Sequence, residues 1–314
     1  MAAPPVRTAR VRLIILILMV TAGLVAMLEA GTRLAFSRLS AIETRISNEH
    51  QAAGAIRPIS GRPSLLLVGN SLLLHAVDVS LLKQLLPGNA RTYMYAIEQT
   101  YLLDWQYGIR RLFADGSRPD VIAVVMGAVH VRPARIRGDY SAYYLFRTAD
   151  LPEIAATLNY DLTKESSLYF ARYSLFFAGR NNLRNFVLNK VDPSYSRFLH
   201  ALATESAPKV DPAFIRSTAH ERLNAMRREC DVNGAKLVFV IAPGSAPEEA
   251  AAVVLGAREA GIECLVPSQG ESFPPSLFEY GFHLNATGAT KFTRLLAPEL
   301  ENVLGMSARG ASRP

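Results

Sequence analysis

Cysteine and tryptophan are scarce in this sequence of 314 residues, which contains two cysteines and one tryptophan. Cys230 and Cys264 are too few for a fold held together by disulfides, and they lack the spacing of a zinc site. We place Cys230 at the end of a predicted helix and Cys264 inside a predicted strand. We therefore expect two independent buried thiols rather than a bridge.

Metal-ligand clusters and glycine-rich phosphate loops are also absent from the sequence. No group of His, Asp and Glu residues has the spacing of metal ligands, and no glycine pattern matches a phosphate-binding loop. We therefore predict that the protein works without a metal ion or another cofactor.

Dense runs of Lys and Arg are missing too, although the net charge is +7. No DNA- or RNA-binding motif accompanies this charge, so we expect no nucleic-acid partner. The charge instead favours a basic domain that works beside anionic lipid or an acidic polymer.

The N-terminus has no acidic residue before Glu29. Residues 13–30 begin with an uncharged apolar run, close to the about 20 residues that cross a bilayer. The only charges in residues 1–12 are arginines, which hold an N-terminus in the cytoplasm. We predict a single-pass anchor in the inner (cytoplasmic) membrane, with the main domain periplasmic. Leu28 stands where a cleavage site needs a small residue, which favours an anchor over the alternative, a cleaved signal peptide.

A juxtamembrane helix and linker are expected over residues 31–62, followed by one α/β domain over residues 63–304. In this domain, short apolar runs alternate with helical patterns, which is typical of a doubly wound parallel sheet. The expected strands are Ser64–Gly69, Thr92–Ala96, Val121–Met126, Lys236–Ala242 and Ile262–Val266. The expected helices are Leu72–Leu86, Leu102–Phe113, Pro212–Cys230, Pro247–Ala260 and about Asn285–Val303.

Residues 134–210 interrupt this alternation, since they are rich in Tyr, Phe, Arg and Asn and show no strand pattern. We expect a mostly helical insertion here. Within it, Leu168–Leu188 combines aromatic residues and arginines at helical spacing. This segment is either an interfacial helix on the membrane or a cap helix packed against the sheet. Residues 305–314 are expected to be a disordered tail.

The first predicted strand leads through Gly69-Asn70-Ser71 directly into a helix. A residue at this point lies where open α/β sheets bind their ligands, and a helix N-terminus favours the negative charge of an oxyanion. Ser71 is therefore a candidate nucleophile, and the insertion a candidate lid over it. The alternative is that Ser71 only caps the helix, because serine is a preferred N-cap.

A second block precedes the last helix and reads YGFHLNATG over residues 280–288. The Gly-Asn-Ser block and this His-Leu-Asn-x-x-Gly block together resemble the SGNH/GDSL hydrolase superfamily, which usually carries Gly-Asp-Ser and Asp-x-x-His. The resemblance covers roughly residues 64–130 and 235–303. It implies a flavodoxin-like sheet, with Ser71 as nucleophile and His283 as general base.

Two positions depart from the family's pattern. Tyr280 stands where the family has an acid, which leaves the adjacent Glu279 as the candidate acid. Val129 falls where the family has an asparagine that donates to the oxyanion. Between His75 and His130, we expect the first to be a packing or surface residue and the second to line the crevice. The candidate pocket residues are Asn70, Gln99, Thr100, Gly127 and His130.

Two functions follow from the resemblance. The first is a membrane-anchored esterase or O-acyltransferase that acts on an exported glycan or another envelope substrate through Ser71 and His283. The alternative is an inactive SGNH-like module that binds a glycan or scaffolds envelope proteins during polysaccharide assembly. The altered acid position favours the second function, and the presence of both Ser71 and His283 favours the first.

Overall fold

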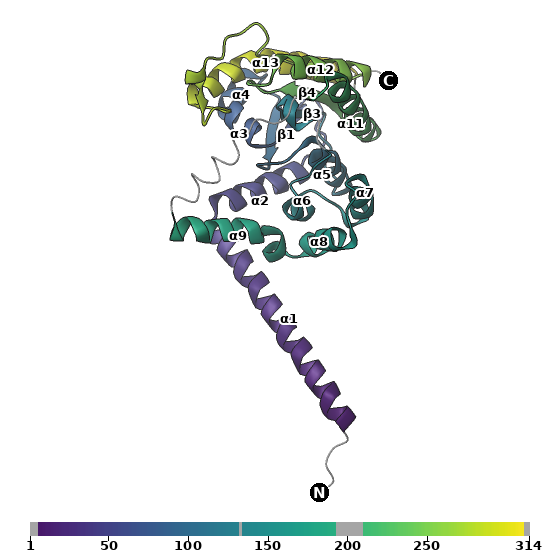
Figure 1. Cartoon of the computed structure of the whole chain (residues 1–314). Coiled ribbons are helices and arrows are strands. Elements are labelled where there is room, and N and C mark those ends of the chain that lie inside the picture. The colour runs from purple at the N-terminus through teal and green to yellow at the C-terminus, as the bar shows by residue number, and fades with distance from the viewer. Residues whose placement is uncertain (1–5, 132–133, 193–209, 311–314) are drawn as a thin grey trace.

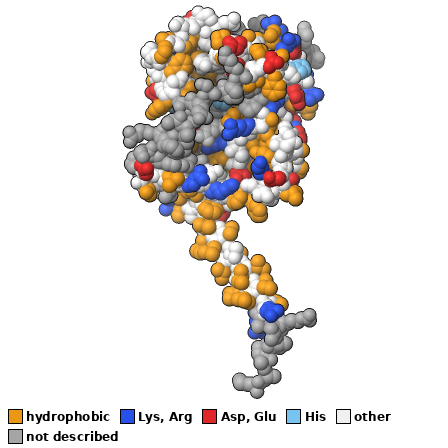
Figure 2. Space-filling view, viewed as in Figure 1, with side chains coloured by type: hydrophobic (Ala, Val, Ile, Leu, Met, Phe, Trp, Pro, Cys, Tyr) orange, Lys and Arg blue, Asp and Glu red, His pale blue; other side chains and the backbone are white. Residues whose placement is uncertain are grey.

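The computed structural model describes residues 6–131, 134–192 and 210–310 and consists of an α/β body from which one long helix projects (Figure 1). This helix, α1 (Val6–Leu39), exposes apolar side chains along its length, and Figure 2 shows them lining the stem. Its segment Arg10–Phe36 is long and apolar enough to cross a membrane, which extends the predicted span of 13–30 at both ends.

The body is joined to α1 through Glu29. The carboxylate of Glu29 accepts hydrogen bonds from Ser174 Oγ (2.8 Å) and from the backbone N–H groups of Leu175 (3.1 Å) and Phe176 (3.0 Å). These groups start α9 (Leu175–Val191), so α1 and α9 are fixed to one another by a capping carboxylate.

The segment predicted as a juxtamembrane linker belongs largely to the body. Helix α2 (Ala41–Gly54) begins at Ser40, whose Oγ accepts a hydrogen bond from the N–H of Glu43. Ile46 and Ala53 are seven residues apart, on one face of α2, and both are buried. Only the end of the 31–62 segment is a connection without regular structure.

Five parallel strands form the sheet, in the order β2-β1-β3-β4-β5. They are β1 (Ser64–Gly69), β2 (Arg91–Ala96), β3 (Val121–Met126), β4 (Lys236–Ile241) and β5 (Glu263–Leu265). The predicted strands are confirmed, although β5 is shorter than expected. Successive residues of a strand point to opposite faces, so each strand supplies two cores.

Helices cover both faces of the sheet. One core contains Leu66 and Val68 of β1, and the other contains Leu65 and Leu67. The first core includes α2, α5 (Leu102–Ala114), α11 (Pro212–Val232) and α12 (Pro247–Glu259), and the helices of the insertion extend it. The helices of the second core are α3 (Ser71–Ala76), α4 (Val79–Leu85) and α13 (Ala286–Gly310). The body is therefore a three-layer sandwich with a parallel sheet in the middle.

Two helix predictions were wrong in their extent. The expected helix over Leu72–Leu86 is divided into α3 and α4, because Asp78 caps α4 by accepting a hydrogen bond from the N–H of Leu81 (3.0 Å). The N–H of Asp78 itself donates to Thr293 Oγ1 of α13 (2.9 Å). At the other end of the chain, α13 continues to Gly310, so residues 305–310 are helical rather than disordered. Residues 311–314 lie outside the described part.

The insertion is helical, as predicted, over residues 134–192, and residues 193–209 lie outside the described part. Its helices are α6 (Asp139–Tyr144), α7 (Leu151–Thr157), α8 (Leu162–Tyr173) and α9. The single helix expected over Leu168–Leu188 is interrupted at Ser174, whose Oγ caps α9. Helices α8 and α9 lie at the base of the body, where α1 leaves it (Figure 1). These two helices therefore form no lid over the start of α3.

Candidate functional site

The candidate site starts at the end of β1, where the chain passes closely beside β3. A Cβ atom on Gly69 would lie 2.3 Å from the carbonyl oxygen of Val125, so only glycine fits there. The next residue, Asn70, caps α3 by accepting a hydrogen bond from the N–H of Leu72 (2.9 Å). Because Asn70 is the cap, Ser71 is the first helical residue and its hydroxyl is not needed to start the helix.

His283 is brought to Ser71 by a short hairpin of β6 (Phe278–Glu279) and β7 (His283–Leu284). The Nε2 atom of His283 lies 3.0 Å from Ser71 Oγ, a hydrogen-bond distance between residues 212 positions apart. The structure thus brings together the two residues of the predicted dyad.

The remaining residues of the histidine block hold the hairpin in place. Asn285 Oδ1 accepts from the N–H of Gly288 (3.0 Å), and its Nδ2 donates to the carbonyl oxygen of Ser276 (2.8 Å). A Cβ on Gly288 would lie 2.6 Å from the carbonyl oxygen of Leu277. The Leu-Asn-x-x-Gly stretch therefore fixes the start of α13 against the hairpin, and this contact positions His283.

His75 is a member of the site that the sequence analysis had treated as a packing or surface residue. It lies one turn after Ser71 on α3, and its ring stacks on that of His283, with centroids 4.1 Å apart and planes 10° apart. The i, i+4 spacing of Ser71 and His75 was the available signal, since such residues share one face of a helix.

Tyr280, three residues before His283, lies in the turn of the hairpin. Tyr280 has a φ of 54° and is 74% exposed, so its side chain extends from the tip of the turn. Glu279 is the register partner of His283 across the two strands. Side chains of directly opposed residues lie on the same face of an antiparallel pair, so Glu279 and His283 share a face. Glu279 is exposed to solvent, where its charge acts through a high dielectric.

Two of the predicted pocket residues serve the fold. Thr100 is buried, its hydroxyl donates to the carbonyl oxygen of Ile97 (2.7 Å), and it accepts from Trp105 Nε1 (2.9 Å). Asn70 Nδ2 donates to the carbonyl oxygen of Thr100 (3.0 Å). These side chains fix the ends of β1 and β2, and their donors are engaged within the protein.

Gln99 has a backbone conformation that glycine favours, with a φ of 61°, and its side chain is exposed. Gly127, at the end of β3, is closely surrounded: its Cβ would lie 3.0 Å from Leu72 Cδ1 and 3.4 Å from His130 Nδ1. The end of β3 therefore meets the start of α3 at Gly127. Val129 is 38% exposed, and its side chain offers no donor.

His130 combines burial with an open nitrogen. Its Nδ1 is buried and has no hydrogen-bond partner among the described residues. Burial lowers the pKa of His130, an effect opposed by a hydrogen bond with the backbone of Gly127, so the imidazole is neutral at pH 7. The His130 ring therefore lies as a neutral imidazole beside Gly127, at the end of β3.

Ser245, in the loop after β4, was missed by the sequence analysis. Its Oγ accepts a hydrogen bond from the N–H of Ala128 (3.1 Å) and donates to the carbonyl oxygen of Ala242 (3.2 Å). Ser245 thus fixes the turn after β3. A cavity of about 260 Å³ lies between this loop and the hairpin of His283. It is lined by Gly244, Phe273, Pro275, Phe278 and Gly281.

Both cysteines are free, as expected, and neither suits a nucleophilic role. Burial raises the pKa of the Cys230 thiol well above its ordinary range and that of Cys264 to about 12. Within the described ranges, no group of three or more His, Cys, Asp or Glu residues is arranged to hold a metal ion.

Comparison of the chain with models of known protein families gives no match, and no curated protein matches the sequence.

Proposed function

We propose that Ser71 and His283 form a catalytic dyad that hydrolyses or transfers an ester-linked acyl group. The observation that carries this proposal is the 3.0 Å separation of Ser71 Oγ and His283 Nε2, with Asn70 rather than Ser71 capping α3. The resemblance of both blocks to the SGNH/GDSL superfamily supports the same roles. The strand order β2-β1-β3-β4-β5 is also that of flavodoxin-like sheets, whose ligands bind at the carboxyl ends of β1 and β3.

The proposed chemistry proceeds in two steps. His283 Nε2 takes the proton of Ser71 Oγ as this oxygen attacks the ester carbonyl carbon, and the tetrahedral intermediate carries its negative charge on the former carbonyl oxygen. When the intermediate collapses, the carbon–oxygen bond to the alcohol breaks, and His283 protonates the departing alkoxide. Water or a sugar hydroxyl then attacks the acyl-serine, with His283 again as base, and Ser71 is released.

The oxyanion requires donors other than the family's asparagine. The backbone N–H of Ser71, at the start of α3, is our first candidate, since groups at that end of a helix favour negative charge. The family also has a glycine donor after its second strand, where this chain reads Glu98-Gln99-Thr100. Within this stretch, Gln99 has a glycine-like backbone conformation, with a φ of 61°. The neutral His130 beside Gly127 is the candidate side chain on the β3 side.

The localisation that we propose follows from α1. Arginines before the apolar span support an N-terminus in the cytoplasm and a body outside the inner membrane, in the periplasm. The substrate class is then an acylated exported glycan or another envelope component. Helix α3, which carries Ser71, lies in the half of the body away from the projecting part of α1 (Figure 1).

A serine-reactive fluorophosphonate tests the dyad directly on the full-length protein in detergent. We expect Ser71 to be labelled, and labelling to be lost in Ser71→Ala and slowed at least about 100-fold in His283→Ala. Ser80→Ala, an exposed serine on α4, is the matched control and should label normally. A folded wild-type protein that takes no label would contradict the enzyme proposal.

The alternative function is a binding or scaffolding module in envelope polysaccharide assembly. It is favoured by one observation: the family's acid is replaced by Tyr280, at the exposed tip of the hairpin turn. In that case an acetylated glycan would bind with equal affinity to the wild type and to Ser71→Ala, and no acyl group would be released.

A further inference from the structure

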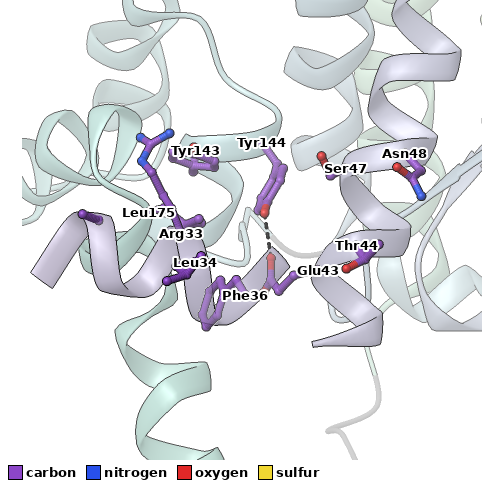
Figure 3. A pocket seen from close by; sticks show the side chains of 11 residues that line it. Arg33, Leu34, Phe36, Glu43, Thr44, Ser47, Asn48, Tyr143, Tyr144 and Leu175 are labelled. Atoms are coloured by element: carbon purple, nitrogen blue, oxygen red, sulfur yellow. Dashed lines mark hydrogen bonds between the residues drawn. The ribbon is translucent and has the colours of Figure 1, made fainter. Parts of the chain in front are cut away.

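Two adjoining cavities lie at the base of the body, where α1 meets α2, α6 and α9. The larger has a volume of about 750 Å³ and the smaller about 390 Å³, and Arg33, Ser47, Tyr143 and Tyr144 line both. Figure 3 shows the larger cavity, with Arg33 and Tyr143 on one side and α2 on the other. Neither cavity belongs to the Ser71 site.

Three guanidinium groups converge on the smaller cavity. Arg33 comes from α1, Arg111 from α5 and Arg172 from α8, three segments that are distant in the sequence. Like charges placed together are unfavourable unless an anion lies between them, because Coulomb repulsion is weakly screened in a partly buried site. The convergence therefore needs a physical reason.

The nearby carboxylates do not neutralise this set. Arg33 pairs with Glu29 (2.6 Å), and Arg111 lies 3.5 Å from Asp115. Arg172, in contrast, has no carboxylate within ion-pair distance among the described residues, and its buried Nε has no hydrogen-bond partner there. Arg172 lies over the ring of Tyr173, 5.7 Å from its centroid, but it has no carboxylate partner of its own among the described residues.

Glu43, in the larger cavity, is committed to other groups. Its two oxygens accept hydrogen bonds from Tyr140 Oη (2.7 Å) and Tyr144 Oη (2.6 Å), and Figure 3 shows the second contact. A buried carboxylate held by two hydroxyl groups has few acceptor sites left for an arginine.

His50 also lines the smaller cavity. Burial, together with the charges of Arg111 and Arg172, lowers its pKa to about 4, and its buried Nδ1 has no partner among the described residues. His50 therefore lines the cavity as a neutral imidazole and leaves the arginines as its charged groups.

The surroundings indicate an amphiphilic ligand. The larger cavity is lined on its α1 side by Ala30, Leu34 and Phe36, at the end of the membrane-crossing segment. On α8, the side chains of Phe170 and Tyr173 are each 65% exposed, and Tyr173 lines the smaller cavity. Figure 2 shows Lys and Arg side chains gathered on the body close to where α1 leaves it.

We propose that the cavity of Arg33, Arg111 and Arg172 binds the phosphate group of a phospholipid or lipid-linked phosphate. The ligand would lie at the outer face of the membrane that α1 crosses. Planar guanidinium groups bind phosphate oxygens in pairs, and 390 Å³ leaves room for a phosphodiester. Ala30, Leu34 and Phe36 then contact the apolar part of the ligand. This site does not depend on the proposed enzyme function.

The test uses the full chain in a neutral detergent and native mass spectrometry. The ligands are dioleoyl phosphatidylglycerol, the matching diolein that lacks phosphate, and inorganic phosphate. We expect phosphatidylglycerol to bind and diolein not to bind. Arg172→Gln should weaken binding about tenfold or more, because a hydrogen bond to a charged group is lost. The control is Arg184→Gln, an exposed arginine of α9 that does not line the cavity, and it should bind as the wild type does.

A second measurement separates a ligand site from a structural role. Removing a guanidinium from a like-charged cluster relieves repulsion, so the ligand-free Arg172→Gln protein should melt at the same temperature as the wild type or a higher one. Arg172→Lys keeps the charge but loses the planar fork, and should bind with intermediate affinity. Inorganic phosphate binding that competes with the lipid would identify a soluble phosphate as a second source.

Two outcomes would overturn the proposal. One is that Arg172→Gln binds phosphatidylglycerol and inorganic phosphate with the same affinities as the wild type does. The other is a lower melting temperature of ligand-free Arg172→Gln combined with unchanged binding by Arg172→Lys, which would assign Arg172 to the fold alone.

Discussion

The imidazole of His75 lies almost parallel to that of His283, with the ring centroids 4.1 Å apart and the planes 10° apart. His283 also contacts the ring of Phe282, at 4.1 Å between centroids. A histidine base needs a fixed ring orientation, which a triad acid usually supplies through a hydrogen bond. In the proposed dyad, stacking on His75 restricts the rotation of the His283 ring, and we therefore propose His75 as a positioning residue.

Replacing His75 tests this role. We expect His75→Ala to slow fluorophosphonate labelling of Ser71 about threefold to tenfold, because aromatic pairs contribute about 0.5–1.5 kcal/mol. His75→Phe keeps a stacking ring and should restore most of the rate. Since His75 is exposed, the melting temperature should change little in either variant. Equal rates for Ala and the wild type would show that the stacking has no part in positioning.

Glu279 is the second subject for a test, as the register partner of His283. We expect Glu279→Gln to slow labelling about threefold at low salt, the size of effect that an exposed charge pair has. The difference should disappear in about 1 M salt, which screens exposed charges. Glu271→Gln, another exposed carboxylate before the hairpin, is the control. An effect that persists at high salt would instead indicate a direct, partly buried contact.

Gly288 supports the hairpin through close packing. A Cβ at this position would lie 2.6 Å from the carbonyl oxygen of Leu277, so Gly288→Ala should cost about 1–3 kcal/mol and displace His283. The melting temperature and the rate of Ser71 labelling should both fall. Gly305→Ala, in the same helix with nothing within 4 Å, should be neutral or stabilising by up to about 1 kcal/mol. Normal labelling in a destabilised Gly288→Ala would separate the hairpin packing from the site.

His50 predicts a pH dependence of stability. Its pKa in the folded protein, lowered to about 4 from 6.5, means that the unfolded chain binds more protons between these values. The contribution of His50 to the free energy of unfolding is therefore complete above pH 6.5. It decreases by at most about 3 kcal/mol as the pH falls towards 4.

The pH prediction is measured against His50→Gln, because another group acts in the opposite direction. Burial raises the pKa of Asp104 to about 6, so its contribution to stability increases as the pH falls through the same range. Between pH 7 and 4.5, the wild type should lose more stability than His50→Gln. Parallel curves for the two proteins would show that His50 is solvated and titrates normally.

Much of the fold could be predicted from the sequence because the strands are short apolar runs buried on both faces. Ser64–Gly69 and Val121–Met126 carry this signal without interruption, and both are strands. The division between α3 and α4 was missed because apolar spacing continues across Asp78. The break depends instead on a cap and on the hydrogen bond from the N–H of Asp78 to Thr293, which is 215 positions away.

The site divides in the same way. Ser71 and His283 could be paired because the two blocks that contain them together resemble the SGNH/GDSL superfamily. Ser245 and the cavity of Arg33 and Arg172 could not be predicted, since their members come from separate segments with no shared period. His75 is intermediate: its helix position was known, but the hairpin that it faces was not.

The hydrogen bonds of Glu29 to the start of α9 make the stem and the body one unit. A protein whose stem is fixed in this way does not swivel on a flexible tether. If α1 crosses a bilayer, the fold itself sets the distance of Ser71 from the membrane surface. Only a polymer or a lipid-linked chain that reaches this distance from the membrane would contact Ser71. The distance from the membrane would therefore restrict the substrates before the shape of the site does.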